Sequence, residues 1–279
     1  MSAAAALSGM DLNSAELYEP GANPPASRID DAQFFVTQQY RDFLNREPDP
    51  DGLAFWTKEI ASCGNDQQCV DAKRVNVSAA FYLSIEFQQT GYLVYRMYKA
   101  AYGNTSGGPV PIKFDEFLPD TRAIGQGVIV NQPGWEQLLE NNKQVFTSDF
   151  AQRTRFTDAF PMLMSTADFV DKLNANADSP LSQSERDELV NSGMTRAQIL
   201  RAMAEDPDLK KAEFDRAFVL TQYFGYLRRN PPDAPEPTRD FQGYSFWLSK
   251  LDQFNGDFAN ADMVKAFIVS GEYRQRFTQ

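Results

Sequence analysis

The chain has 279 residues, of which 42% are hydrophobic and 23% are charged, proportions typical of a folded globular chain and not of a disordered one. Its 27 basic and 38 acidic side chains give a net charge of −11, which repels phosphate backbones and argues against nucleic-acid binding. Histidine is absent and cysteine occurs twice, which excludes Ser-His-Asp triads, Cys-His pairs, histidine-containing metal sites and an all-thiolate zinc site.

Residues 1–30 are predicted to be an irregular leader. No apolar run in the chain is long enough to span a bilayer, and the first ten residues lack the basic start of a signal peptide. The segment Ser14–Gly21 is similar to the S-A-E-x-Y-D-P turn of a kelch-type propeller blade. One such fragment buries no blade face, so the leader either belongs to a longer protein, docks on a neighbour, or is a solvated tail before a proline-rich linker.

The leader is followed by helical patterns. Apolar residues from Phe35 to Leu44 recur at the spacing of an amphipathic helix. A second helix is predicted to begin with Asp49 as N-cap and Pro50 at its first position, and a longer one to cover Val70–Gln88. Ser182 and Glu185 form a capping box, while residues 127–131 are the only short strand candidate. The fold class is therefore all-α.

The chain also repeats itself. Gln39–Trp56 and Gln222–Trp247 share the pattern Q-Y-x-x-aromatic-L-x-R-x-P, then G-x-x-F-W, with eight extra residues in the second loop. Both continue into F-x-x-S-x-E-aromatic, at Phe81–Phe87 and Phe267–Tyr273. Two weaker copies lie between them. We therefore expect a helical repeat bundle of about four degenerate units, in three parts: the leader 1–30, a first pair of units at 31–160 and a second pair at 161–279.

The pattern from Phe35 to Trp56 resembles the domain-of-unknown-function 4214 family, with one residue fewer between Pro48-Asp49 and Gly52. Ser84–Phe87 corresponds to that family's S-x-E-F ending, and the family is distantly similar to the phycobilisome linker domain, a helical scaffold. The resemblance covers about residues 31–279, strongly in the outer units and loosely in the middle. It implies a bacterial, secreted or surface-displayed protein and no catalytic residues.

Three tryptophans, Trp56, Trp135 and Trp247, fall at corresponding places, each shortly after a glycine. We predict that they are structural core anchors; the alternative is a sugar-stacking platform on each unit. Five tyrosines are candidates for partly exposed contact residues: Tyr82, Tyr92, Tyr95, Tyr102 and Tyr244.

Arginine and glutamate recur together. Arg46 and Arg229 end the first helix of the outer units, and Glu86 and Glu272 lie in the S-x-E endings. The second unit has Asn104 and Arg155 in these two places, so both charges are lost at once. This pattern predicts two structural ion pairs, Arg46 with Glu86 and Arg229 with Glu272.

Cys63 and Cys69 enclose five polar residues, a spacing that fits a small disulfide ring and implies an oxidising compartment; two free cytosolic thiols are the alternative. The acids Glu47, Asp49 and Asp51 resemble a calcium loop poorly, because prolines interrupt them, and helix capping explains them better.

These observations predict no catalytic residue, no metal and no cofactor. We expect a non-enzymatic protein–protein interaction or structural module at the bacterial surface or in the extracellular space, with self-assembly as one form. A carbohydrate-binding module or α-helical glycosidase is the main alternative. A cytosolic linker with free thiols is the third.

Overall fold

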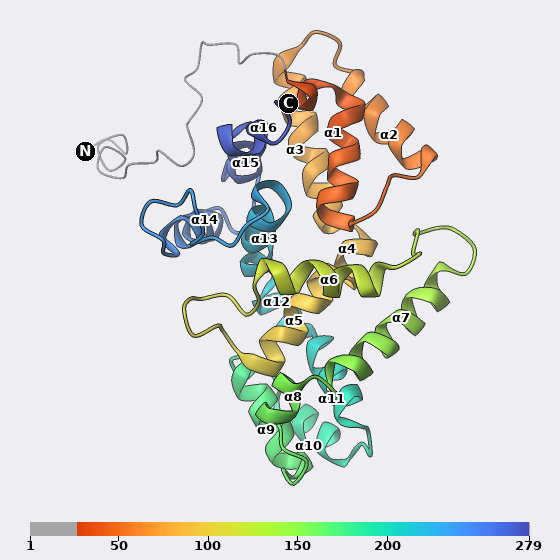
Figure 1. Cartoon of the computed structure of the whole chain (residues 1–279), viewed down its shortest axis with the longest axis vertical. Helices are drawn as coiled ribbons and strands as arrows, with labels where there is room; N and C mark the ends of the chain where they lie inside the picture. Colours follow the sequence, from red (N-terminus) through yellow and green to blue (C-terminus); the bar gives the residue numbers. More distant parts are fainter. Residues whose placement is uncertain (1–26, 279) are drawn as a thin grey trace. The chain divides into compact units, whose positions relative to one another are not determined.

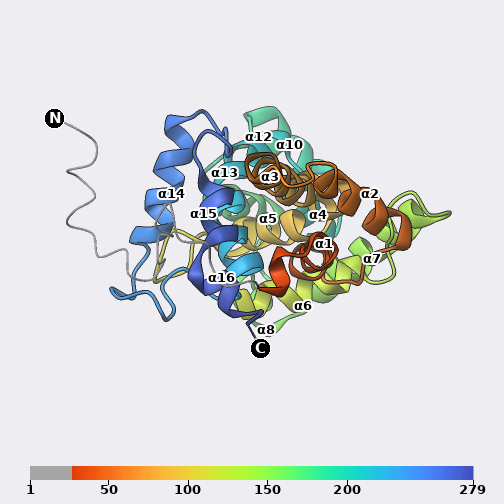
Figure 2. The same cartoon turned by 90° about the horizontal axis from the view of Figure 1, so that it is seen from above.

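The computed structural model describes residues 27–278, and the predicted kelch-like segment lies outside them. Helices and connecting loops make up the whole of this range, which contains no β-strand, so the all-α prediction is confirmed (Figures 1 and 2). The chain forms two compact units that are not continuous in sequence. Among the described residues, unit 1 consists of 27–42, 47–80 and 219–278, and unit 2 of 43–46 and 81–218. The boundary predicted after residue 160 falls inside unit 2, and the number of repeats remains a prediction.

Unit 1 is built from both ends of the chain. The short turn η2 precedes α1, which packs against α2, while α15 and α16 pack against the π-helical turn η4. Its elements are η2 (Arg28–Asp30), α1 (Ala32–Gln39), η3 (Tyr40–Leu44), α2 (Pro50–Ala61), α3 (Gln67–Leu83), α13 (Phe214–Gln222), η4 (Tyr223–Leu227), α14 (Gln242–Gln253), α15 (Met263–Val269) and α16 (Gly271–Gln275). The ends of η3 and α3 and the start of α13 belong to unit 2.

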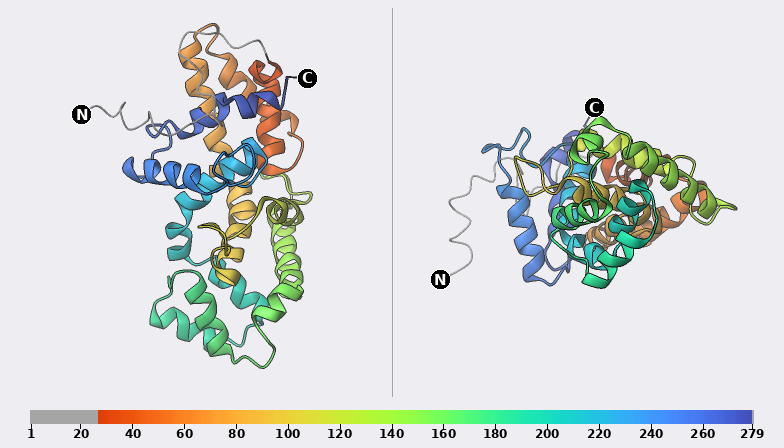
Figure 3. Two further views of the ribbon diagram at one scale, coloured as in Figure 1. Left: turned by 60° about the vertical axis from the view of Figure 1, so that its left-hand side comes forward. Right: turned by 90° about the horizontal axis from the view of Figure 1, so that it is seen from below.

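Unit 2 is organised around α5 (Gly91–Tyr102), which packs against α4, α6, α9 and α11 (Figure 3). Eleven of the twelve residues of α5 are buried, as expected for a central helix. The other helices of the unit are α4 (Ile85–Gln89), α6 (Phe114–Gly125), α7 (Trp135–Phe150), α8 (Thr154–Ala159), α9 (Thr166–Asn176), α10 (Gln183–Asn191), α11 (Arg196–Ala204) and α12 (Pro207–Ala212).

Local sequence signals place two helix starts correctly. The Asp49 carboxylate accepts a hydrogen bond from the Gly52 N–H at 2.8 Å, and Pro50 is the first residue of α2, as predicted. The predicted capping box of Ser182 and Glu185 begins α10. The single helix predicted over 70–88 is wrong: Ser84 adopts an extended conformation and caps α4, so α3 ends at Leu83. Residues 127–131 form turns and loop instead of the candidate strand.

The core is rich in tyrosine and phenylalanine. Tyr82, Tyr92, Tyr95 and Tyr244 are buried, and only Tyr102 of the five predicted contact tyrosines is partly exposed. The prediction of an exposed tyrosine surface is therefore wrong for four residues. Two of the hydroxyl groups have partners inside unit 2: Tyr82 donates to the Phe214 carbonyl at 3.0 Å and Tyr95 to the Glu213 carboxylate at 2.7 Å. An amphipathic ring with a satisfied hydroxyl packs in a core as readily as at a surface.

The predicted disulfide between Cys63 and Cys69 is confirmed, with a Cα–Cα distance of 5.5 Å. It joins the end of α2 to the first turn of α3, where Asp66 Oδ1 accepts hydrogen bonds from the Gln68 and Cys69 N–H groups. The bond counts against the cytosolic linker with free thiols. Within residues 27–278, no helix is long and apolar enough to cross a membrane.

Candidate functional site

The first candidate cluster is the ion pair of Arg46 and Glu86 in unit 2. Arg46 Nε lies 2.7 Å from Glu86 Oε1, and Arg46 Nη2 lies 2.8 Å from Oε2, so the guanidinium binds the carboxylate through two parallel hydrogen bonds. The side chains are 18% and 5% exposed, respectively. The contact joins the turn after η3 to the first turn of α4. It is the pair predicted from the sequence, held in the geometry that makes such pairs strong.

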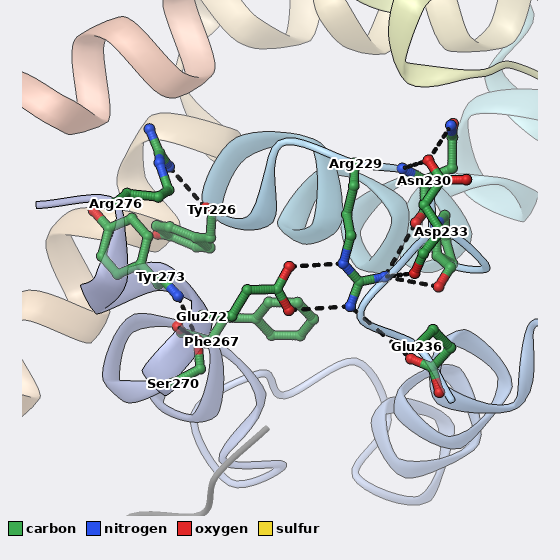
Figure 4. Close-up of polar contacts among 11 residues, drawn as sticks. Tyr226, Arg229, Asn230, Asp233, Glu236, Phe267, Ser270, Glu272, Tyr273 and Arg276 are labelled. Carbon is green, nitrogen blue, oxygen red and sulfur yellow. Dashed lines mark hydrogen bonds and ion pairs between the residues drawn. The ribbon is translucent and has the colours of Figure 1, made fainter. Parts of the chain in front are cut away.

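The second cluster is the pair of Arg229 and Glu272 in unit 1 (Figure 4). Arg229 Nε lies 2.7 Å from Glu272 Oε1, and Nη2 lies 3.1 Å from Oε2. Arg229 Nη1 also donates to the backbone carbonyls of Asn230, Pro231 and Asp233 at 2.8–3.3 Å. One buried guanidinium thereby fixes both the S-x-E ending and the longer loop that follows η4.

The backbone around the two arginines is the same. Each follows a five-residue π-helical turn, η3 or η4, which is a rare element in proteins. The residue before each arginine has a left-handed backbone, with φ of 55° at Asn45 and 56° at Arg228. Each S-x-E serine caps the helix that carries the glutamate: Ser84 Oγ accepts from Phe87 N–H and Ser270 Oγ from Tyr273 N–H, both at 3.1 Å. The outer copies thus share local geometry as well as sequence.

In unit 1, the glycine of each G-x-x-F-W motif lies against the hydroxyl group of a tyrosine from the same copy, which leaves no room for a side chain. A Cβ atom at Gly52 would lie 2.1 Å from the Tyr40 hydroxyl oxygen, and one at Gly243 would lie 2.8 Å from that of Tyr223. Both tyrosines are buried, so their rings have little room to withdraw. The third glycine, Gly134, has open space around it and a φ of 82°, so it serves a different purpose.

We expect Gly52→Ala to lower the free energy of unfolding by about 1–3 kcal/mol, because the added methyl group overlaps the Tyr40 hydroxyl. Urea denaturation of the full chain measures this. Gly125→Ala is the matched control: it also lies in a helix, its Cβ would be 3.8 Å from Thr90 Cγ2, and alanine there should be neutral or stabilising. The cost of Gly52→Ala should shrink in a Tyr40→Phe background; an equal cost in both backgrounds contradicts the explanation.

In the middle of the chain, the residues at the positions that correspond to the Arg–Glu pair have other partners in unit 2. Asn104 accepts a hydrogen bond from Lys99, and Arg155 pairs with Glu116 at 2.7 Å while its guanidinium lies 3.9 Å from the centre of the Tyr102 ring. Asn104 and Arg155, which replace the arginine and the glutamate, therefore each have a partner of their own.

The three tryptophans are less buried than the prediction of core anchors implies. Trp56, Trp135 and Trp247 are all partly exposed, although the Trp247 ring lies 5.8 Å from that of the buried Phe267. Ile60 is the only buried residue of α2, and Trp135 begins α7 beside a surface hollow of about 240 Å³. Trp56 and Trp247 each form an edge-to-face pair with the preceding phenylalanine, at ring distances of 4.9 and 5.0 Å and interplanar angles of 76° and 74°. The two outer copies thus place the same aromatic pair at the surface.

Sequence reasoning missed the charges buried along α5. Lys99 lies 2.8 Å from Asp178 and 3.9 Å from Glu213. Arg96 Nε donates to the carbonyl of Ala204, the last residue of α11, at 2.6 Å, where a cation complements the helix dipole. Their partners are about 80 to 120 residues away in the sequence, so no local spacing indicates them.

Two of the acids that resemble a calcium loop have other partners. Glu47 pairs with Arg41 at 2.9 Å, and Asp49 caps α2. In the described part of the chain, no group of three acidic or cysteine side chains is placed to hold a metal ion.

In both clusters a glutamate carboxylate neutralises the arginine guanidinium, and both side chains are largely buried. This arrangement suits the clusters to positioning the backbone and not to binding a ligand. Beside the second cluster, burial and the nearby carboxylates of Asp240 and Glu272 raise the pKa of Glu236, although Arg229 opposes this. Neither the hollow beside Trp135 nor a second hollow on α3 includes any member of the two ion pairs.

The fold and the clusters together define an all-helical module whose outer copies are closed by Arg–Glu pairs. Residues 25–90 match the family model of the domain of unknown function DUF4214, which confirms the predicted resemblance over the first copy. No curated protein and no solved structure matches the chain.

Proposed function

We propose that this chain is a non-enzymatic protein–protein interaction module of the bacterial surface or extracellular space, and that it associates with other copies of itself. One observation carries the proposal: a turn in unit 2 presents two large apolar side chains to solvent. Met162 is 93% exposed and Leu163 is 99% exposed. Neighbouring apolar side chains that are left this open are a feature of contact sites.

Hydrogen bonds to its backbone carbonyls hold this turn in place. Met164 N–H donates to the Pro161 carbonyl at 2.9 Å, and Arg196, the first residue of α11, donates to the carbonyls of Phe160, Pro161, Met162 and Met164 at 2.6–3.4 Å. Phe160 anchors the turn in the core, 5.0 Å from the ring of Phe169. A preorganised apolar tip loses little conformational entropy when it binds, which favours association.

The disulfide supports the proposed location, because such bonds persist in oxidising compartments. The bacterial, secreted context implied by the DUF4214 resemblance points the same way.

Sedimentation of the full chain over a wide concentration range, with electron microscopy of the same samples, tests the proposal. We expect concentration-dependent association that the double variant Met162→Ser/Leu163→Ser weakens. Val145→Ser, which removes an exposed apolar side chain on α7, is the control and should leave association unchanged. A monomer at every concentration excludes self-association and leaves only binding to a different protein.

Carbohydrate binding is the second candidate function, and the surface Phe–Trp pairs favour it. Exposed aromatic rings stack on the apolar faces of sugars, and the same pair stands on α2 and on α14. Neither the hollow on α3 nor the one beside Trp135 is lined by these pairs, which favours a binding module over a glycosidase.

A further inference from the structure

Unit 1 contains an open groove of about 380 Å³ between α3 and the segment that leads into α15. One wall is a stripe of α3 that runs from Gln68 to Asn76 at positions i, i+3, i+4, i+7 and i+8, which share one helix face. The other wall contains Phe258, Asp262 and Lys265. The volume is at the lower end of the range for small-ligand sites.

Both walls are fixed before any ligand arrives. The start of α3 is tied down by the Cys63–Cys69 disulfide and by the Asp66 cap. On the opposite side, Asp257 Oδ1 accepts hydrogen bonds from the N–H groups of Ala259 and Asn260 at 3.0 and 2.9 Å, which folds a tight turn around Phe258.

Most polar side chains of the groove are not used by the fold; the exception is Asp71, whose Oδ1 accepts a hydrogen bond from Gln67 Nε2 at 2.7 Å. Asp262 stands at the N-cap of α15 with a φ of 54°, yet its carboxylate makes no capping hydrogen bond. Within residues 27–278, the side chains of Asn76, Asp262 and Lys265 form no hydrogen bond or ion pair with other residues. These groups are available to a ligand.

The chemistry of the groove selects a class of ligand. Phe258 and Val75 provide apolar surface, while the rim offers two carboxylates, two amides and one ammonium group. The charged groups, Asp71, Asp262 and Lys265, sum to −2 + 1 = −1, which disfavours anions. Hydroxyl groups both donate and accept, so a polyhydroxylated ring satisfies carboxylates and amides together. We propose that this groove binds a neutral saccharide, an inference that rests on the second candidate function.

Saturation-transfer NMR of the full chain with oligosaccharides of glucose, galactose, mannose and N-acetylglucosamine tests this, with oligogalacturonate as the anionic probe. We expect binding of a neutral oligosaccharide, weakened about ten-fold or more by Phe258→Ala and by Asn76→Ala. Phe254→Ala, in the same loop but outside the groove lining, and Gln253→Ala, an exposed amide on α14, are the matched controls. Circular dichroism verifies that each variant is folded.

The possible outcomes distinguish saccharide binding in the groove from carbohydrate binding elsewhere on the chain. Binding that survives both groove variants but is lost in Trp56→Ala/Trp247→Ala overturns the groove and retains carbohydrate binding on the aromatic pairs. No signal from any neutral or anionic probe overturns both, whereas binding of oligogalacturonate alone overturns the neutral-saccharide assignment and retains carbohydrate binding. Loss of binding in the groove variants with full binding in both controls supports the assignment.

Discussion

Replacing Glu86 by Gln should lower the free energy of unfolding by about 3–5 kcal/mol, the range for removing one partner of a buried ion pair. Glutamine keeps the volume of the side chain, but its amide group places N–H donors where Arg46 needs an acceptor. Arg46 Nε and Nη2, now 2.7 and 2.8 Å from the carboxylate, would face an incomplete partner in a poorly hydrated place. Urea denaturation followed by circular dichroism measures the loss.

The exposed pair Arg41–Glu47 provides the control. It has the same two-bond geometry, at 2.9 and 3.0 Å, but its side chains are 47% and 69% exposed. Arg41→Met should therefore cost less than about 1 kcal/mol. The double variant Arg46→Met/Glu86→Leu should recover part of the Glu86→Gln loss, because no unpaired charge remains. A Glu86→Gln cost no larger than that of Arg41→Met contradicts a structural role for the pair.

The second pair should respond asymmetrically. In Glu272→Gln, Arg229 keeps its three carbonyl partners, so its guanidinium is not left without acceptors. Arg229→Met leaves both a carboxylate and those carbonyls without a donor, and should cost more than Glu272→Gln.

Features that depend on a few consecutive residues were predictable from the sequence. Asp49-Pro50 begins a helix because capping and a fixed φ act within one turn, and the disulfide follows from a short loop between two cysteines. The Arg–Glu pairs were predictable for a different reason. The two charges appear together in the outer copies and disappear together at Asn104 and Arg155, which links positions 40 residues apart.

Burial was harder to predict, because it depends on what covers a helix. Trp56 and Trp247 have the size of core anchors, yet α2 and α14 bury few of their residues, whereas α5 buries a lysine and an arginine. The break at Ser84 was missed because an S-x-E sequence is also compatible with a continuous helix. In the structure the serine instead ends α3 and caps α4. The groove on α3 depends on Phe258 and Asp262, nearly 190 residues from its other wall, and no sequence pattern connects them.

Raising the pH above 10 should unfold the protein, because buried tyrosines cannot ionise in place. Burial raises the pKa of Tyr92 and of Tyr102 from 10.0 to about 12, and it raises the pKa of Tyr98, Tyr223, Tyr226 and Tyr273 as well. A folded-state pKa above the unfolded value contributes stability that is complete below pH 10 and is lost as the pH rises through the folded-state pKa. With five buried tyrosines and the partly exposed Tyr102, helix content and phenol absorbance should change in one step between about pH 10 and 12.

Tyr273→Phe separates this mechanism from general alkaline damage. The Tyr273 hydroxyl is buried and has no hydrogen-bond partner within residues 27–278, so its removal should be neutral or stabilising at pH 7 and should move the alkaline midpoint upward. Tyr98→Phe is the comparison, because its hydroxyl donates to Asp120 at 2.8 Å and also lies 3.1 Å from Arg153. That variant should lose stability at pH 7, since Asp120 loses a donor. Ordinary titration of all eleven tyrosines near pH 10 with the helices intact would show that burial does not hold these phenols neutral.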